Sequence, residues 1–187
     1  MLVGISGIDA SGKGYLAAKI ADRLQMEGLK VATISADDWL NLPEVCINRD
    51  NYAEHFYEHA IRFDQMFEQL ILPLREKRGI SLTADCADAK ATSYRTQCYE
   101  FRKINIVLLE GIFLFQHAYR HHFDLTVWID CSFECALERA VGRGQEGLPP
   151  AETIKAFKTI YFPAQLIHLA RDNPREAADY IFTNDKL

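Results

Sequence analysis

Hydrophobic residues in this chain form short continuous runs that alternate with segments of helical periodicity. The apolar run Met1–Ile5 is followed by apolar residues at helical spacing between Tyr15 and Glu27, and Gly28 closes that segment. A short apolar run predicts a buried strand, and the periodic segment predicts a helix that ends at the glycine. The chain therefore opens with a strand, a connecting loop and a helix.

The same alternation continues along the rest of the chain. Further strands are predicted at Lys30–Ser35, Ile104–Leu109, Leu125–Asp130 and Tyr180–Phe182, and Tyr94–Arg102 alternates in a way that also suits a strand. Helical patterns extend from after Asp38 to Arg78, with a kink expected at Pro73, from Ser132 to Val141, and from after Gly147 to about Ala170. This order predicts an α/β fold with a mainly parallel sheet covered by helices, with ligands at the carboxyl ends of the strands. The second strand is expected beside the first.

Composition agrees with one compact domain over residues 1–187. With 49% hydrophobic and 25% charged residues, a chain of 187 residues can bury a sizeable core as a single α/β unit. The formal net charge is −5, the pI is about 5.7, and the basic residues are scattered. Because binding to a nucleic-acid backbone needs clustered positive charge, we expect no nucleic-acid partner.

The cysteines and the hydropathy suggest a reducing compartment away from the membrane. Five cysteines, with no C-x-x-C pair, make a disulfide framework or a zinc site improbable. No apolar run approaches the roughly 18 residues that a membrane span needs, and the N-terminal segment is typical of a core strand rather than a signal peptide. We therefore expect a cytoplasmic protein without a membrane partner.

The loop between the first predicted strand and helix reads GIDASGKG at residues 7–14, the spacing of a phosphate-binding loop. In such a loop, backbone N–H groups surround the phosphates of a nucleotide, and glycines at positions 7 and 12 allow a close approach that a Cβ would block. Lys13 is expected to reach the β- and γ-phosphates. The predicted nucleotide-binding residues are Gly7, Asp9, Ala10, Ser11, Gly12, Lys13, Gly14 and Tyr15.

The loop departs from the common pattern at Gly14, where Ser or Thr usually supplies a hydroxyl to Mg²⁺. Two interpretations are open. Either water and carboxylates hold the metal without that hydroxyl, or the loop binds nucleotide and has lost catalysis. The Lys-Gly pair is similar to that of the adenylate kinase family, whose members are active, and this favours the first interpretation.

Acidic residues are predicted near the same loop. Glu110 ends the strand at 104–109, where its carboxylate can face the triphosphate and suits a hard cation such as Mg²⁺. Asp37 and Asp38 end the second strand, where a carboxylate can accept a proton from an attacking hydroxyl. The alternative for these residues is a helix cap or a solvated turn. Asp9 lies within the loop, and its carboxylate is expected either to point away from the phosphates or to contact the acceptor.

Several segments follow one another in a recognisable order. They are residues 7–13, SADDW at 35–39, VLLEGIFL at 107–114, FDL at 123–125, and LERA at 137–140 with Arg143. Their order resembles the uridine kinase and phosphoribulokinase family of P-loop kinases, most of all its uridine kinase-like bacterial members. The similarity extends over nearly the whole chain and includes residues 56–64, 161–165 and 177–181. It implies one P-loop kinase domain with a small lid at about 139–150.

The resemblance also implies roles for individual residues. Asp37 matches the acid of the family's Asp-x-Phe-Tyr motif and would be the catalytic base, with Trp39 where an aromatic residue is usual. Glu110 would hold Mg²⁺, directly or through water, with Asp37 beside it. Arg139 and Arg143 match the start of the lid, and together with Lys13 they would offset charge in the transition state.

The acceptor is less certain from the resemblance. Uridine kinases carry a Tyr and a His for the pyrimidine where this chain has ADCADA at 84–89, which puts uridine in doubt. Asp85 is a candidate for binding sugar-like hydroxyls. His55 and His59 lie four apart on a predicted helix, and they either approach the same pocket or are surface residues. The predicted acceptor-binding residues are Asp38, Trp39, His59 and Asp85.

Together these features predict an ATP- and Mg²⁺-dependent kinase that transfers a phosphoryl group to a hydroxyl of a small molecule, such as a nucleoside or a related polyol. The competing hypothesis is a nucleotide-binding regulator with weak or no catalysis. Gly14 favours the regulator, and the presence of Asp37 and Glu110 opposes it. A homo-oligomer is compatible with either.

Overall fold

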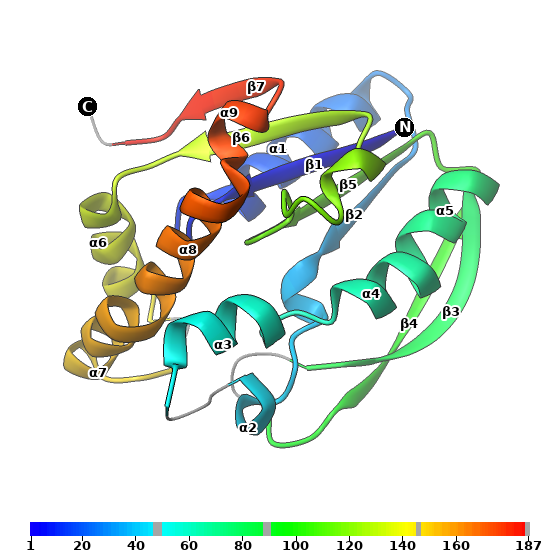
Figure 1. Cartoon of the computed structure of the whole chain (residues 1–187). Coiled ribbons are helices and arrows are strands. Elements are labelled where there is room, and N and C mark those ends of the chain that lie inside the picture. Colours follow the sequence, from blue (N-terminus) through cyan, green and yellow to red (C-terminus); the bar gives the residue numbers. More distant parts are fainter. Residues whose placement is uncertain (47–49, 88–90, 145–146, 186–187) are drawn as a thin grey trace.

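The computed structural model describes residues 1–46, 50–87, 91–144 and 147–185 (Figure 1). Its main sheet has five parallel strands in the order β2-β5-β1-β6-β7. The strands are β1 (Leu2–Gly7), β2 (Val31–Ser35), β5 (Ile106–Gly111), β6 (Leu125–Asp130) and β7 (Tyr180–Thr183). The predicted α/β fold with a parallel sheet is therefore confirmed. The expected pairing of the first two strands is wrong, because β5 lies between β1 and β2.

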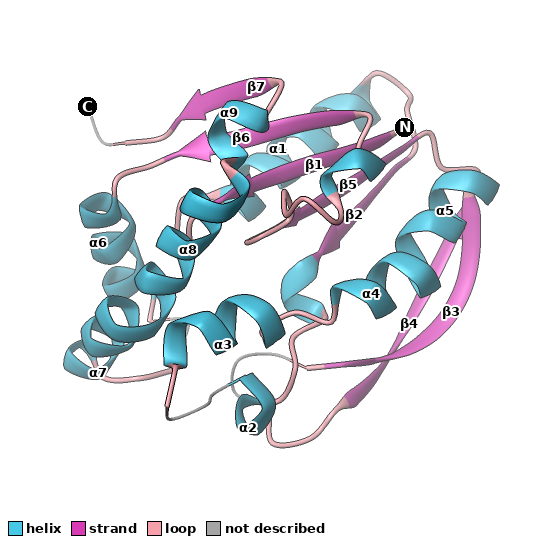
Figure 2. Cartoon of the chain, viewed as in Figure 1, coloured by secondary structure: helices cyan, strands magenta, loops and turns pink. Residues whose placement is uncertain are grey.

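Helices cover both faces of the sheet (Figure 2). Helix α1 (Lys13–Met26) packs on one face, where Val3 and Ile5 of β1 meet Ala17 and Ala21. The opposite face lies against the larger core. The remaining helices are α2 (Pro43–Cys46), α3 (Tyr52–His59), α4 (Phe63–Met66), α5 (Leu72–Lys77), α6 (Phe133–Arg143), α7 (Pro150–Ala156), α8 (Phe162–Asp172) and α9 (Pro174–Ala177). In the described part of the chain, no helix has both the length and the apolar character needed to cross a membrane.

The long helical region predicted after Asp38 is divided into several helices. After a 3₁₀ turn at Ala36–Asp38 come α2, α3 and α4, and a π-helical turn at Phe67–Ile71 joins α4 to α5. Pro73 follows this turn directly, where the expected kink takes the form of a wider turn that accommodates the missing N–H. A second π-helical turn, Phe157–Tyr161, precedes Pro163 in the same way.

A separate antiparallel ribbon projects beside the main sheet (Figure 1). It consists of β3 (Gly79–Cys86) and β4 (Arg95–Arg102), paired from Gly79 opposite Arg102 to Cys86 opposite Arg95. The predicted strand at 94–102 corresponds to β4, whereas β3 was not predicted. A further short 3₁₀ turn, Arg120–His122, precedes β6.

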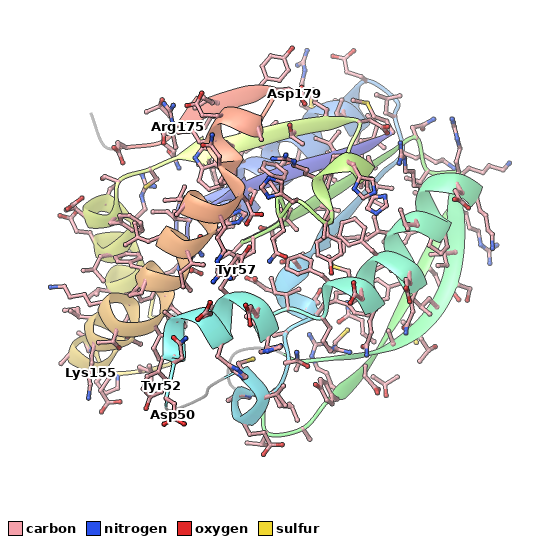
Figure 3. The ribbon with its side chains drawn as sticks, viewed as in Figure 1. Asp50, Tyr52, Tyr57, Lys155, Arg175 and Asp179 are labelled. Carbon is pink, nitrogen blue, oxygen red and sulfur yellow. The ribbon has the colours of Figure 1, made fainter. Side chains whose placement is uncertain are left out.

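A buried carboxylate joins α3 to α8. The Asp172 side chain, 5% exposed, accepts hydrogen bonds from the Tyr57 hydroxyl at 2.5 Å and from His168 Nδ1 at 2.7 Å. Its other oxygen accepts from the backbone N–H of His117 at 3.0 Å and from His117 Nδ1 at 2.8 Å. Tyr57 points from α3 toward α8 (Figure 3). Burial alone raises the pKa of Asp172, but the hydrogen bonds from His168, Tyr57 and His117 outweigh it and hold this pKa well below its usual range.

We expect Asp172→Asn to lower the free energy of unfolding by about 3 kcal/mol at pH 7. The side-chain NH₂ of asparagine would face the groups that now donate hydrogen bonds to the buried carboxylate, so these donors would lose their acceptor. A carboxyl with a depressed native pKa stabilises the fold above its unfolded pKa of about 3.9, and this contribution is lost as the pH falls toward the native pKa. The difference in the free energy of unfolding between the parent and Asp172→Asn, measured by urea unfolding, should therefore become smaller from pH 5 to pH 3. The exposed Asp22→Asn is the control, and a difference that does not change with pH would contradict this role for Asp172.

Candidate active site

A cavity of about 860 Å³ opens at the carboxyl ends of β1, β2 and β5. Its walls come from the phosphate-binding loop, the ends of β2 and β5, helix α6 and the segment after β7. The lining residues are Asp9, Ala10, Gly12, Lys13, Gly14, Tyr15, Ser35, Asp37, Asp38, Glu110, Ile112, Arg139, Gly142, Arg143 and Asn184. Six of the eight residues predicted to bind nucleotide line this cavity. Gly7 and Ser11 lie beneath it.

The loop has the geometry that a phosphate cradle needs. Ala10 and Gly12 adopt left-handed backbone conformations, with φ of 57° and 98°. A Cβ at Gly7 would lie 2.8 Å from the Ile129 carbonyl oxygen, so this position requires glycine. Helix α1 begins at Lys13, so its positive end faces the cavity. The residues therefore fit a triphosphate.

Lys13 is held within the loop. Its side chain is buried, and Nζ donates a hydrogen bond to the Ile8 carbonyl oxygen at 2.7 Å. The ammonium group is thus held by a carbonyl of its own loop at the wall of the cavity. Among the described lining residues there is no other lysine.

Gly14 faces Glu110. A Cβ at position 14 would lie 3.9 Å from the carboxylate atoms of Glu110, which is an ordinary van der Waals distance. The position that usually bears the metal-binding hydroxyl therefore lies beside the carboxylate predicted to hold Mg²⁺. A hard cation takes oxygen ligands of this kind, and the Glu110 and Asp37 carboxylates on one wall fit it.

We expect Gly14→Ser to fold, to keep or raise transfer activity, and to lower the Mg²⁺ concentration that gives half the maximal rate, because the added hydroxyl lies beside Glu110. Gly14→Ala adds the same Cβ without the hydroxyl and is the matched control. Initial rates over a Mg²⁺ titration measure the effect. A folded, ATP-binding Ser variant that needs more Mg²⁺ than the parent would rule out metal binding at this position.

The carboxyl groups of the cavity affect one another. Burial raises the pKa of Glu110, and the nearby Asp37 raises it further, whereas hydrogen bonding to Ser35 and the charge of Lys13 act in the opposite direction. Asp37 is open to the cavity, and the protein atoms around its carboxylate partly desolvate it. This desolvation raises its pKa, Asp38 adds to the effect, and Lys13 and Arg143 oppose it. A carboxylate with a raised pKa is a stronger base toward a hydroxyl proton.

Asp37 and Asp38 are neighbours in the sequence, but different residues hold them in place. The Ser35 hydroxyl accepts a hydrogen bond from the Asp37 backbone N–H at 3.3 Å and caps the 3₁₀ turn. The Asp38 carboxylate lies 3.3 Å from Arg95 Nη2 and accepts from Gln97 Nε2 at 3.5 Å, both on β4. The ribbon therefore fixes Asp38 at the outer wall, and Asp37 faces the cavity from the same turn.

The other three residues predicted to bind the acceptor lie away from the cavity. Trp39 is 1% exposed and stacks on Tyr99, because it belongs to the core between the sheet and the ribbon. The side chain of His59 is exposed and its ring packs against His55, which supports the surface interpretation. Asp85 is exposed on β3, where it pairs with Thr96 of β4, and its carbonyl oxygen accepts a hydrogen bond from Arg62. Of the segment 84–89, residues 88 and 89 lie outside the described residues.

Both predicted lid arginines line the cavity from α6. Arg139 donates to the Asn184 carbonyl oxygen at 2.6 Å and to the Ser11 carbonyl oxygen at 3.5 Å. Arg143 is exposed at the helix end, and its charge lowers the pKa of Asp9 and of Asp37. In the predicted lid at 139–150, Gln145 and Glu146 lie outside the described residues.

Two residues at the loop were not predicted from the sequence. Asn184 Nδ2 donates to the Ser11 carbonyl oxygen at 2.7 Å, and Gln165 Nε2 donates to Asp9 Oδ2 at 2.9 Å. Each lies more than 150 positions from its partner, so no local pattern indicates the contact. The family resemblance rests partly on segment 161–165, which ends at Gln165, and on segment 177–181, which precedes Asn184. These two segments were the only indication in the sequence that both regions belong to the site.

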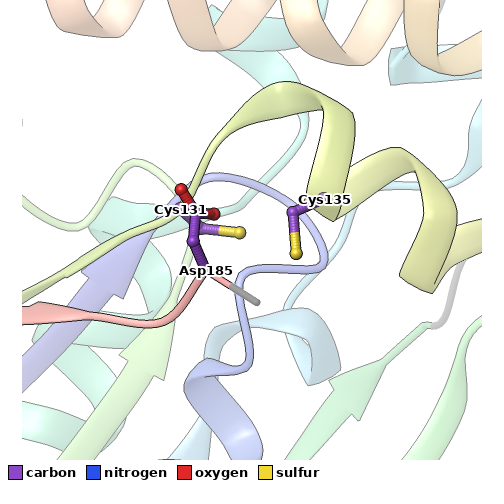
Figure 4. A group of neighbouring side chains, drawn as sticks. All are labelled: Cys131, Cys135 and Asp185. Atoms are coloured by element: carbon purple, nitrogen blue, oxygen red, sulfur yellow. The ribbon is translucent and has the colours of Figure 1, made fainter. Parts of the chain in front are cut away.

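Cys131, Cys135 and Asp185 gather behind the loop (Figure 4). Arg139 Nη1 lies 3.5 Å from Cys131 Sγ, and Asp185 accepts hydrogen bonds from the backbone N–H and the hydroxyl of Ser132. Burial raises the pKa of the Cys131 thiol, which opposes the thiolate that a metal needs. The guanidinium and the occupied carboxylate make this group a poor cation site.

The sequence was compared with models of known families. The model of the "Phosphoribulokinase / Uridine kinase family" matches residues 2–146. The chain belongs to this family. Its members are kinases, and the resemblance inferred from the motifs is confirmed. A comparison with curated protein sequences gave no match.

Solved structures support the same fold. A possible uridine kinase from Bacillus stearothermophilus has a TM-score of 0.78 at 22% identity, covering 97% of this chain and 88% of the other. A Silicibacter sp. TM1040 protein, provisionally named as a fructose transport system kinase, has a TM-score of 0.70 at 20% identity, covering 97% and 89%. The D-glycerate 3-kinase from Cryptococcus neoformans has a TM-score of 0.61 at 11% identity, covering 89% and 77%. At these identities the likeness establishes the fold.

Proposed function

We propose that this protein is an ATP- and Mg²⁺-dependent kinase that transfers the γ-phosphoryl group to a hydroxyl of a small molecule. The observation that carries the proposal is the convergence of Lys13, Glu110 and Asp37 on one cavity. The names of the similar structures cite uridine, fructose and D-glycerate. All three compounds bear hydroxyls, which supports the reaction class and leaves the acceptor open. Within this proposal the protein works in the cytoplasm.

The charged residues of the cavity and the loop amides divide the work of this reaction. The loop amides and Lys13 bind the phosphates and hold them in line with the acceptor, and Glu110 with Asp37 provides the oxygen ligands for Mg²⁺. When bound, Mg²⁺ neutralises charge on the β- and γ-phosphates. Arg139 and Arg143 place positive charge at the α6 side and, as part of a lid over about 139–150, exclude water.

Asp37 acts on the acceptor. Its carboxylate takes the proton of the attacking hydroxyl as the acceptor oxygen forms a bond to the γ-phosphorus. The bond from that phosphorus to the β–γ bridging oxygen breaks, and ADP leaves with the electron pair. The products are a phosphate monoester and ADP, and the proton on Asp37 returns to solvent.

The second candidate is a nucleotide-binding regulator, and Gly14 is the observation that favours it. Without the usual hydroxyl, the loop would bind ATP and phosphorylate nothing. The two candidates differ in one measurable property, acceptor-dependent formation of ADP. A screen of nucleosides, vitamins and sugars with ATP and Mg²⁺ therefore separates them. Phosphorylation of at least one compound supports the kinase, whereas ATP binding without any product supports the regulator.

A further inference from the structure

The Asp9 carboxylate is tied to a helix outside the phosphate-binding loop. Asp9 lines the cavity, and its Oδ2 accepts a hydrogen bond from Gln165 Nε2 at 2.9 Å. Gln165 is on α8, between the second π-helical turn and Asp172, and its side chain is completely buried. Because α8 is anchored to α3 through Asp172 and Tyr57, Gln165 is a rigid support. The structure thus fixes the Asp9 carboxylate through Oδ2 at the wall of the cavity.

The orientation of Asp9 does not serve phosphate binding. A carboxylate in a phosphate-binding loop repels the phosphates, so fixing it there needs another purpose. Burial raises the pKa of Asp9, and Asp37 raises it further, whereas Lys13, the hydrogen bond from Gln165 and Arg143 favour the charged form. Asp9 and Asp37 therefore interact across the same cavity. Two carboxylates at this place suit hydroxyl donors.

The charges of the cavity point to the same ligand. The lining bases are Lys13, Arg139 and Arg143, which the nucleotide phosphates engage, and the lining acids are Asp9, Asp37, Asp38 and Glu110. Glu110 faces the metal position beside Gly14, and Asp38 is paired with Arg95. In the proposed mechanism Asp37 serves both Mg²⁺ and the attacking hydroxyl, and Asp9 is then left to the acceptor. Among the lining residues that the structure describes, a negatively charged acceptor would meet these two carboxylates and no cation beyond the three assigned to the phosphates.

We propose that Asp9, positioned by Gln165, binds a second hydroxyl of the acceptor next to the hydroxyl that Asp37 activates, so that the substrate is an uncharged polyol with neighbouring hydroxyls. This inference rests on the proposed kinase function and names its substrate class. Asp9 contacts substrate, and Gln165 is a positioning residue. Phosphorylated sugars and hydroxy acids are disfavoured.

The test compares matched acceptors. The neutral and anionic pairs are glycerol with D-glycerate, D-ribose with D-ribose 5-phosphate, and D-fructose with D-fructose 6-phosphate. The pairs that differ by one hydroxyl are uridine with 2′-deoxyuridine and 3′-deoxyuridine, and D-glucose with 2-deoxy-D-glucose. Acceptor-dependent ADP formation gives kcat and KM for each compound. For the preferred acceptor, we expect kcat/KM to exceed that of its anionic partner by about 10-fold or more and that of its deoxy analogue by about 10- to 100-fold.

Variants assign this preference to residues. Asp9→Asn should reduce both kcat/KM ratios, neutral over anionic and parent compound over deoxy analogue, to about threefold or less. It should keep the KM for ATP within about threefold, because the amide keeps the shape of the side chain and removes its charge. The exposed Asp22→Asn on α1 carries the same charge change and should leave both differences intact. Gln165→Leu should raise the acceptor KM more than it lowers kcat. The Asp9→Asn, Gln165→Leu double variant should be no worse than Asp9→Asn, because Gln165 acts through Asp9.

The outcomes separate the two proposals. If the parent phosphorylates none of these compounds and none in the wider screen, the kinase function fails and this inference fails with it. If the parent phosphorylates an anionic partner as well as the neutral one, or if Asp9→Asn keeps the deoxy discrimination, the kinase function stands and this inference is overturned. Additive effects in the double variant overturn the role of Gln165. Should Gln165→Leu not fold, Asp9→Asn alone decides for Asp9, and Gln165→Asn, whose shorter amide cannot reach Asp9, takes its place.

Discussion

Lys13→Ala is expected to abolish measurable phosphoryl transfer and to weaken ATP binding by about 10-fold or more. Lys13 is the only lysine among the described residues that line the cavity, and it lies at the N-terminus of α1, where we expect the β- and γ-phosphates to bind. Its removal leaves those oxygens with the backbone N–H groups of the loop and the arginines of α6, and an ammonium in a low-dielectric site contributes several-fold more than one in water. Titration with ATP and initial-rate assays on the same preparation measure both effects.

Folding should survive this substitution, since the Lys13 side chain donates its hydrogen bond to a single carbonyl of its own loop. Circular dichroism and the midpoint of thermal unfolding establish that. The exposed Lys30→Ala removes the same charge elsewhere and should match the parent in both assays. An unchanged ATP affinity in well-folded Lys13→Ala would mean that the loop does not bind the phosphates.

Asp37→Asn is expected to leave ATP affinity within about threefold of the parent and to cut the transfer rate by about 100-fold or more. Nucleotide binding depends on the loop, whereas Asp37 lies at the end of β2 and faces the acceptor side of the cavity. The base must be ionised to act, and the surroundings of Asp37 raise its pKa. The parent rate should therefore rise with pH through that pKa, and Asp37→Asn should lose this rise.

One comparison makes this result specific. Asp38→Asn changes the adjacent carboxylate, which Arg95 and Gln97 hold at the outer wall, and it should have the smaller effect on the rate. Unchanged turnover in Asp37→Asn would remove Asp37 from the mechanism and direct attention to Asp38 or Asp9. A large loss of ATP affinity in that variant would instead assign Asp37 mainly to metal or nucleotide binding.

The sequence predicts those parts of the site that are encoded by short, continuous segments. The loop at 7–14 carries its own glycines and lysine, and the strands that end at Ser35 and Gly111 are recognisable as apolar runs. Their carboxyl ends meet in a parallel sheet, so the convergence of Asp37 and Glu110 with the loop follows from the pattern. The ranges of β1, β2, β5 and β6 accordingly agree with prediction to within two residues.

Other features depend on contacts between distant segments. Gln165 and Asn184 reach the loop from α8 and from after β7, and neither residue type is distinctive in its local sequence. Trp39 lies two residues after Asp37, the predicted catalytic base, yet the 3₁₀ turn at 36–38 directs its ring into the core. The strand β3 alternates only weakly, and its pairing with β4 supplies the hydrogen bonds that define it. Helical spacing predicted that His59 shares a helix face with His55, but it did not show whether that face contacts the cavity or solvent.

The central claim is that this cavity moves a phosphoryl group from ATP to a hydroxyl, and ³¹P NMR of complete reaction mixtures tests it most directly. The parent protein is incubated with ATP, Mg²⁺ and each neutral polyol of the panel, beside Asp37→Asn and Lys13→Ala. We predict a new phosphate monoester signal that grows in step with ADP for at least one polyol and that is absent with either variant. Binding of ATP by the parent without a monoester from any compound, or an equal monoester yield from Asp37→Asn, would contradict the claim.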